Sequence, residues 1–204
     1  MKNMRLTVCI GIMCGWLAAG MLHAGTRPDH VRPVEEDGSR LWLPVIRPVE
    51  GAEVEITYKG KVSPTIAIAI AELKNAWKGD PVLLEKKKTG RGDGFAITSS
   101  EHQVRILSST ETGLLYGAYS LLRMQAAGQL TVPLSVTEQP AYDLRILNHW
   151  DNPDGTVERG YAGRSLWNWE ELPGTLSPRY EAYARANASV GINGTVLNNV
   201  NASP

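Results

Sequence analysis

Between residues 40 and 140, apolar positions recur with two periods that distinguish strands from helices. Short runs in which apolar and polar residues alternate are typical of half-buried strands. They predict strands at residues 52–58, 81–87, 94–100, 102–108 and 130–140. Longer runs with apolar residues every three to four positions predict amphipathic helices at residues 64–77 and 108–129. Ser63 and Pro64 are typical of a helix start, because Ser caps free amides and Pro loses no hydrogen bond there.

The order of these elements predicts the fold of residues 40–140, which we expect to form an amino-terminal, non-catalytic domain. Two helices that interrupt five strands without strict alternation favour an α+β layer, with a mixed sheet and both helices packed on one face. Pro133 cannot donate a backbone hydrogen bond, which indicates an edge position for the last strand.

A different order begins at residue 141 and continues to residue 204. A strand over residues 142–150, with Leu144, Ile146 and Leu147 as its apolar body, is followed by a long loop, a helix from Pro178 and a strand over residues 192–202. Parallel strands joined by a helix build barrels or doubly wound sheets, whose sites lie on the loops after the strands. A complete barrel takes about 250 residues. We therefore expect an incomplete β-α-β start of a TIM barrel and a chain cut from a larger protein.

The first 39 residues predict export rather than folded structure. Residues 1–24 combine basic residues, an apolar run and small residues at the end, which is typical of a cleaved secretory signal peptide. Residues 25–39 are polar and contain prolines, which indicates a linker. The expected location is secreted or periplasmic, without membrane attachment after cleavage.

Charge and composition exclude several classes of partner. The 204 residues contain 21 basic and 21 acidic side chains, so no net field attracts a polyanion, and nucleic acid is not an expected partner. Both cysteines, Cys9 and Cys14, lie in the predicted signal peptide, which removes disulfides and thiolate metal sites from the mature chain. We expect no cofactor.

Residues 148–167, "NHWDNPDGTVERGYAGRSLW", crowd charged, aromatic and glycine residues into one loop, and a metal site is one interpretation. A calcium loop needs oxygen ligands at alternate positions and a Glu at the twelfth. Pro153 occupies a ligand position counted from Asp151, and the twelfth residue is Ala162. Catalytic zinc needs three protein ligands, whereas this loop offers the single His149. No metal is expected.

A sugar site is the competing interpretation of the same loop. Pyranose recognition uses an aromatic plane and a dense set of donors and acceptors, which Trp150 and its polar neighbours supply at the end of a predicted strand. Arg159 and Arg164 add planar forks suited to a carboxylate. Each residue also has a structural interpretation: Trp150 as core, Arg164 paired with Asp154 or Glu158, and His149 as a satisfied donor. Their density at one loop favours a site.

The same stretch resembles the start of the catalytic barrel in the family 67 glycoside hydrolases, the xylan α-1,2-glucuronidases. "GTVLNNVNA" at residues 194–202 is similar to the family's second barrel strand, and "DGSRLWL" and "SSTETGLLYGAYSLLR" upstream also fit. The second of these, at residues 108–123, also resembles the small α+β domain that precedes the barrel in β-hexosaminidases. The resemblance covers nearly all of residues 37–204.

The resemblance implies an inverting glycosidase that removes glucuronic acid, or its 4-O-methyl ether, from xylooligosaccharides. Inversion needs a general acid and a carboxylate base on opposite sides of the sugar. In the family these carboxylates lie on later strands, so we expect no catalytic residue in this chain and no activity from it alone. Family relatives are often dimers, and a homodimer is the expectation for the full-length protein.

The resemblance also assigns binding roles within this chain. Trp150 is expected to form a stacking wall of the uronate pocket, and Val200 to contact the 4-O substituent. The other candidate ligands of the sugar are His149, Asp151 and Arg159. For Glu158 and Arg164 the role is left open, and loop bracing is the preferred interpretation.

Two alternatives remain open at this point. The chain could act alone as a carbohydrate-binding or interaction module, or it could be the front part of another barrel glycosidase of the β-hexosaminidase type.

Overall fold

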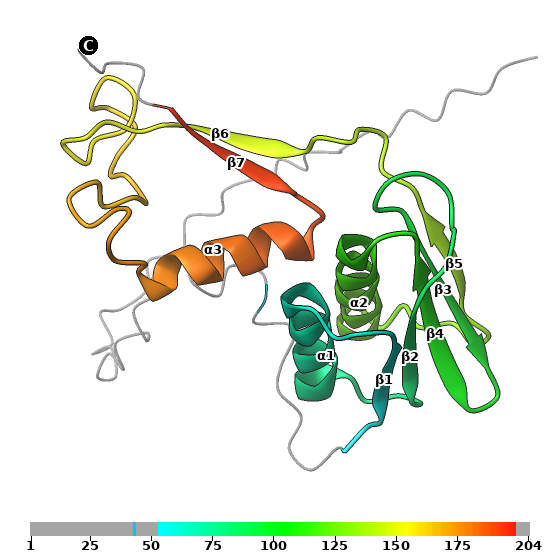
Figure 1. The fold of residues 1–204 in the computed structure, drawn as a ribbon. Helices are drawn as coiled ribbons and strands as arrows, with labels where there is room; N and C mark the ends of the chain where they lie inside the picture. Colours follow the sequence, from blue (N-terminus) through cyan, green and yellow to red (C-terminus); the bar gives the residue numbers. More distant parts are fainter. Residues whose placement is uncertain (1–42, 44–52, 199–204) are drawn as a thin grey trace, which may run out of the picture. The chain divides into compact units, whose positions relative to one another are not determined.

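A computed structural model of the chain describes Leu43 and residues 53–198. The predicted signal peptide, the linker and Val200 lie outside the described residues. The described part forms seven strands and three helices (Figure 1). In order they are β1 (Ile56–Lys59), α1 (Pro64–Ala76), β2 (Val82–Lys86), β3 (Phe95–Ser100), β4 (Gln103–Ser108), α2 (Glu111–Ala126), β5 (Ser135–Glu138), β6 (Ile146–Trp150), α3 (Pro178–Ser189) and β7 (Gly194–Asn198).

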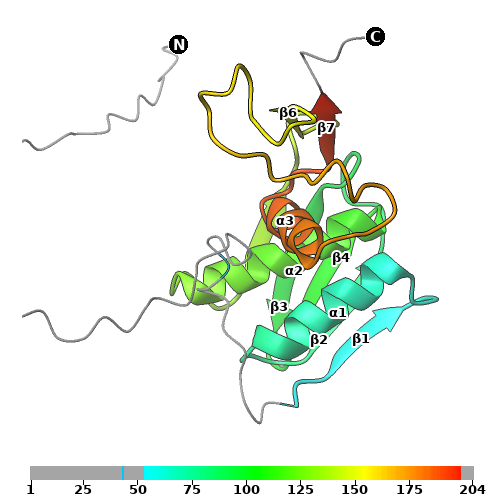
Figure 2. The same cartoon turned by 90° about the vertical axis from the view of Figure 1, so that its left-hand side faces the viewer.

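The first five strands form one mixed sheet with the order β1-β2-β4-β3-β5. Strands β1, β2 and β4 run parallel, whereas β3 is antiparallel to both β4 and β5. Helix α1 packs against α2 and β1, and α2 packs against β2, β3 and β4. Figures 1 and 2 show both helices on the same side of this sheet. The predicted α+β layer with a mixed sheet and two helices on one face is therefore confirmed.

The core of this layer lies between the sheet and the two helices. Its fully buried side chains come from both helices and from β2, β3 and β4, and the largest are Tyr119, Ile66, Leu73, Leu84, Ile97, Ile106, Leu114, Leu121 and Leu122. Their burial removes apolar surface from water, at roughly 25 cal/mol per Å². Helix α2 of this layer also contacts the carboxy-terminal helix α3.

Local signals determine the ends of α1 as the sequence predicted. The Ser63 hydroxyl accepts a hydrogen bond from the Ile66 amide at 3.3 Å, and Pro64 occupies the first helical turn. Trp77 ends the helix, and its indole Nε1 donates to the Asp80 carbonyl at 2.8 Å. Both ends are therefore set by residues adjacent in sequence.

The last strand of the sheet is shorter than its sequence pattern predicted. β5 begins at Ser135, so Pro133 precedes the strand instead of lying within it. The strand nevertheless occupies the edge of the sheet, as expected. Pro133 follows a cis peptide bond, and Leu134 beyond it is buried in the core.

The elements after residue 141 form a β-α-β unit, as predicted. Strands β6 and β7 run parallel, with His149 opposite Leu197 and Trp150 opposite Asn198. Helix α3 begins after Ser177, whose hydroxyl accepts from the Arg179 amide at 3.3 Å. The chain leaves α3 through Gly191, which has a positive φ of 78°. The long loop lies at the carboxyl end of β6.

The predicted apolar body of β6 is only partly covered by the described residues. Leu144 precedes the strand and is 75% exposed, while Ile146 and Leu147 are 48% and 38% exposed. Parallel sheets normally have both faces covered, and here α3 alone follows β6 before β7.

No helix in the described part of the chain is long and apolar enough to cross a membrane.

Candidate functional site

The candidate site is built at the carboxyl end of β6, where side chains alternate between two faces. His149 points toward α3, where its Nε2 lies 2.5 Å from the Tyr183 hydroxyl. Trp150, the next residue, therefore projects from the opposite face, which it shares with Asn148 and Ile146. The Trp150 side chain is 47% exposed. The strand thus presents an indole on its open face and a histidine on its supported face.

The surroundings of His149 favour one arrangement of protons. The Thr195 hydroxyl donates to the Tyr183 hydroxyl, with 3.4 Å between Oγ1 and the tyrosine oxygen. The tyrosine oxygen accepts that bond, so its own proton is directed at His149 Nε2. The other ring nitrogen, Nδ1, then carries hydrogen and faces Asp151 Oδ1 at 3.5 Å. Both nitrogens of the imidazole therefore face protein groups, which fixes the ring in one orientation.

Asp151 is buried behind the loop, with 3% of its surface exposed. Its Oδ2 accepts a hydrogen bond from Ser165 Oγ at 2.5 Å, and the Ser165 hydroxyl accepts in turn from the Trp167 amide at 2.9 Å. Burial of a carboxylate is costly unless it is hydrogen-bonded or paired, and Ser165 and His149 meet that need. Asp151 thereby ties the two ends of the loop together.

Aromatic rings enclose His149 on its supported face. The Trp167 ring lies edge-on to His149, with centroids 5.5 Å apart, and edge-on to Tyr183 at 5.4 Å. Tyr180 packs against Trp167 at 4.9 Å, and its hydroxyl accepts from the Asn168 amide at 2.8 Å. Such edge-to-face pairs contribute roughly 0.5–1.5 kcal/mol each beyond their buried area. The cluster joins the loop to α3.

The turn after Trp150 is held by side chain to backbone hydrogen bonds. Asp154 Oδ1 accepts from the Thr156 amide at 2.9 Å and from its hydroxyl at 2.6 Å. These bonds, with the nearby positive charge of Arg164, lower the pKa of Asp154. Asn152 Nδ2 donates to Thr156 Oγ1 at 2.8 Å and to the Glu158 carbonyl at 2.6 Å. The acidic residue predicted as a possible ion-pair partner therefore caps a turn.

Glu158 closes this turn back onto the strand. Its amide donates to the Trp150 carbonyl at 2.7 Å, in a backbone conformation with a positive φ of 53°. Its carboxylate accepts from the Tyr161 hydroxyl. Thr156 and Arg164 form an isolated antiparallel bridge nearby. The loop-bracing role of Glu158 and Arg164 stays a prediction.

Two hollows collect most of the predicted binding residues. One of about 290 Å³ is lined by Asn148, His149, Trp150, Asp151, Val157 and Glu158. The other, of about 540 Å³, includes Glu158 and Arg159 in its lining. Glu158 belongs to both linings, whereas Arg164 belongs to neither. The substrate-binding roles of Trp150, His149, Asp151 and Arg159 stay predictions.

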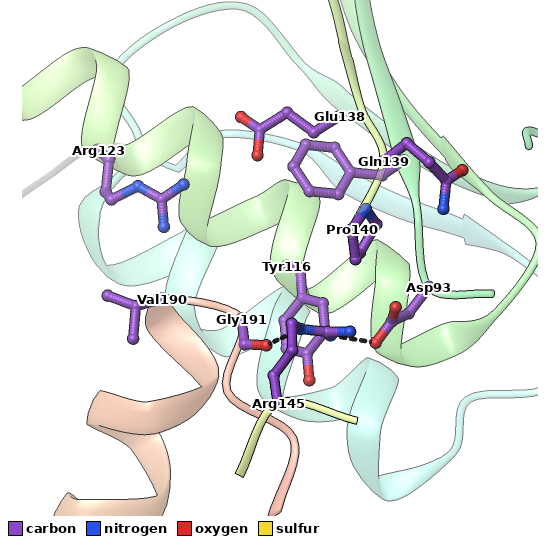
Figure 3. A pocket seen from close by; sticks show the side chains of 10 residues that line it. Asp93, Tyr116, Arg123, Glu138, Gln139, Pro140, Arg145, Val190 and Gly191 are labelled. Carbon is purple, nitrogen blue, oxygen red and sulfur yellow. Dashed lines mark hydrogen bonds and ion pairs between the residues drawn. The ribbon is translucent and has the colours of Figure 1, made fainter. Parts of the chain in front are cut away.

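A third hollow, of about 280 Å³, has a different character (Figure 3). Its lining includes Asp93, Tyr116 and Arg145, which come from the α+β layer and from the segment before β6. Arg145 Nη2 pairs with Asp93 Oδ2 at 2.5 Å, and its Nε donates to the Gly191 carbonyl at 2.6 Å. The polar groups that line this hollow therefore bind one another and join separate elements, so we interpret the hollow as a structural junction.

Metal ligation finds no support in the part of the chain that the structure describes. Among these residues, no group of three or more His, Cys, Asp or Glu side chains is arranged to hold a metal ion. Asp154, the most exposed acid of the loop turn, accepts two hydrogen bonds from Thr156 instead.

The sequence of this site matches a known family. Residues 124–204, which include β6, the loop, α3 and β7, match the model described as the glycosyl hydrolase family 67 middle domain. The match leaves residues 1–123 outside it.

Individual relatives of the chain are named as alpha-glucuronidases. The chain is 43% identical over 112 residues to the "probable alpha-glucuronidase A" of Aspergillus clavatus, and 46% identical over 112 residues to that of Neosartorya fischeri. It is 41% identical over 111 residues to the "alpha-glucuronidase A" of Aspergillus tubingensis. Each alignment covers 54% of this chain and 13% of the relative. The chain therefore spans a small part of their length.

A solved structure, a GH138 enzyme targeting pectin rhamnogalacturonan II, aligns with 52% of this chain and 14% of its own. The TM-score is 0.43 and the identity is 15%, a likeness too slight to support an assignment.

Sequence reasoning missed two residues that hold the loop, one outside it and one within it. The apolar spacing of α3 places Tyr183 on a helix face and says nothing of its hydroxyl, which contacts His149. Ser165, inside the loop, was not singled out, although it binds the buried Asp151. The only signals in the sequence were a tyrosine on the helix following the loop and a serine close to an aromatic residue. Neither signal specifies its partner.

Proposed function

We propose that this chain forms part of a secreted or periplasmic α-glucuronidase. The enzyme hydrolyses terminal glucuronic acid, or 4-O-methylglucuronic acid, α-1,2-linked to xylooligosaccharides, with inversion at the anomeric carbon. The match to the family 67 middle domain and the names of the relatives support hydrolysis of a glycosidic bond to glucuronic acid. The hollow at the end of β6 supports recognition of the sugar.

The observation that carries the proposal is the exposed Trp150 indole on the open face of β6. It stands beside Asn148 in a hollow of about 290 Å³ that also reaches Val157 and Glu158. An aromatic plane bordered by donors and acceptors matches a pyranose ring, whose C–H bonds and hydroxyls need both. The Arg159 side chain lines the adjoining hollow and provides a cation suited to a uronate carboxylate.

The carboxylates of the loop fit recognition better than chemistry. Asp151 is 3% exposed and bound by Ser165, Asp154 caps a turn through Thr156, and Glu158 accepts from Tyr161. An inverting enzyme needs an acid and a base about 6.5–9.5 Å apart on opposite sides of the sugar, with room for water. We infer that this pair lies in other parts of the enzyme.

The proposal is tested with the protein at its full encoded length acting on 4-O-methylglucuronosyl xylooligosaccharides. We expect release of the uronic acid, with the β-anomer as the first product by NMR, because inversion of an α-linkage gives that anomer. Trp150→Ala should lower kcat/KM by about tenfold or more, equivalent to ~1.4 kcal/mol of lost binding. Tyr142→Ala removes an aromatic residue that is 75% exposed before β6, and it should leave the rate unchanged.

Other outcomes would contradict the proposal. Release of N-acetylhexosamine without uronic acid would indicate a glycosidase of the β-hexosaminidase type. Binding of the oligosaccharides without any hydrolysis would indicate a carbohydrate-binding module.

A further inference from the structure

Helix α3 carries two contacts in opposite directions, two residues apart. Tyr183 reaches His149 on β6, with 2.5 Å between its hydroxyl and Nε2. Arg185 reaches Glu72 on α1, in the α+β layer. Because each helical residue advances the side-chain direction by about 100°, these two side chains project about 200° apart. The helix α3 therefore lies between the candidate site and the α+β layer.

The contact with Glu72 is of a kind that fixes orientation. Arg185 Nε donates to Glu72 Oε1 at 2.5 Å and its Nη2 donates to Oε2 at 2.8 Å. The Tyr119 hydroxyl donates to the same carboxylate at 3.0 Å, and Glu72 is only 8% exposed. A planar fork against a buried carboxylate restrains both the distance and the rotation of the arginine. Ala186 beside it is 3% exposed, which holds α3 close to the core.

The contact with His149 is sensitive to small rotations of α3. A turn of about 10° moves an atom at the outer helix radius of ~6 Å by roughly 1 Å. A displacement of that size takes the Tyr183–His149 hydrogen bond from a strong length to one at which it is lost. The imidazole would then lose the partner that orients it toward Asp151, which ties down the loop.

We propose that Glu72 is a positioning residue for the loop of residues 148–167, which carries Trp150. It acts through Arg185, the rotation of α3, and Tyr183. Glu72 orients the imidazole of His149, and through it the loop that carries the exposed indole. The α+β layer is thereby a working part of the sugar site as well as a packing partner. The effect on the sugar rests on the proposed function, whereas the coupling from Glu72 to His149 can be measured without it.

The coupling is measured in the 204-residue chain labelled with ¹⁵N-histidine. The chain has four histidines, so a long-range ¹H–¹⁵N spectrum is simple, and His149→Gln assigns the signal of interest. Tyr183→Phe defines the change expected when the hydrogen bond is lost. The ¹⁵N chemical shifts of the two ring nitrogens of His149 should move toward the values of an imidazole that exchanges between its two tautomers. Glu72→Gln and Arg185→Ala should move the His149 signals in the same direction.

Two further variants separate positioning from stability. Glu85→Gln makes the same chemical change in a carboxylate that pairs with Lys59 and Arg105 on the sheet, and it should leave the His149 signals in place. Arg185→Lys keeps the charge but loses the fork, so it should restore the His149 signals only in part. It also serves as the test variant if Arg185→Ala does not fold.

The inference is overturned if Tyr183→Phe moves the His149 signals while Glu72→Gln and both Arg185 variants fold and leave them unchanged. In the full-length enzyme, Glu72→Gln should raise KM by about threefold or more, with no such change in Glu85→Gln. A full-length parent enzyme that releases no uronic acid would count against the proposed function. Intact Trp150 dependence with no response at His149 would count against the positioning role alone.

Discussion

Replacement of Arg145 by alanine should weaken the junction between the β-α-β unit and the α+β layer. The guanidinium lies in the junction of Figure 3, where Nη2 pairs with Asp93 at 2.5 Å and Nε donates to the Gly191 carbonyl at 2.6 Å. Nη1 donates to the Tyr142 carbonyl at 2.7 Å. The guanidinium also lies over the Tyr116 ring, 5.6 Å from its centroid. One side chain therefore joins four separate segments.

The expected cost follows from what is left behind. The Asp93 side chain is 14% exposed and that of Arg145 is 19%, so removal of the arginine leaves a mostly buried carboxylate without its cation. Breaking a buried pair in this way costs about 3–5 kcal/mol. Loss of the contact with the Tyr116 ring adds about 0.5–1 kcal/mol. Because water can partly reach the junction once the side chain is gone, we expect about 3 kcal/mol in the free energy of unfolding.

Urea unfolding of the 204-residue chain at neutral pH measures this cost, with Arg145→Ala, Asp93→Ala and the double variant forming a cycle. The double variant should be less destabilised than the sum of the single variants, by about 1 kcal/mol or more. Arg105→Ala is the matched control, since its pair with Glu85 has 44% and 23% of the two side chains exposed and should contribute about 1 kcal/mol or less. Additive single effects, or a loss for Arg145→Ala as small as that of the control, would refute the reasoning.

Two further predictions concern α2. Gly117→Ala should destabilise the chain by about 1–3 kcal/mol in urea unfolding, because the new Cβ would lie 2.4 Å from Ile106 Cγ2, and this overpacking outweighs the roughly 1 kcal/mol that alanine gains over glycine in a helix; a gain in stability would contradict it. Burial, and then the charge of Glu72, raises the pKa of Tyr119 above its ordinary value of about 10. The unfolded chain therefore loses this proton first, so the stability is fully present below pH ~10 and falls as pH rises further. Tyr119→Phe should flatten that fall, and equal slopes for the two proteins between pH 9 and pH 11, as rough limits of the test, would count against it.

The elements that the sequence predicted well are those set by neighbouring residues. Ser63 and Pro64 start α1, and Ser177 starts α3, because the cap and the amides it satisfies are at most three residues apart. The alternation of apolar residues likewise located β2, β3 and β4, whose inward side chains face one common core. Periodicity and capping are local, and a single sequence carries them in full.

The contacts that the sequence could not predict join residues far apart in the chain. The apolar spacing after Pro178 predicted a helix, but it gave no sign that Arg185 would meet a carboxylate 113 positions earlier. A glutamate in a helix is usually solvated, so the sequence alone suggests a surface position for Glu72. Its burial follows from three helices meeting at one point, which is a property of the tertiary arrangement.

The loop after β6 shows why crowding of polar residues is a poor guide to catalysis. Its first part, residues 148–167, contains three carboxylates, and two neighbouring acids alone would suggest a catalytic pair. In the structure each of the three holds the loop in shape, since Asp151 is bound by Ser165, Asp154 caps the turn, and Glu158 accepts from Tyr161. Asp151 is 3% exposed and bound by Ser165, so its carboxylate is already engaged within the loop. Trp150 beside it is 47% exposed, so its aromatic ring is the more accessible group of the two.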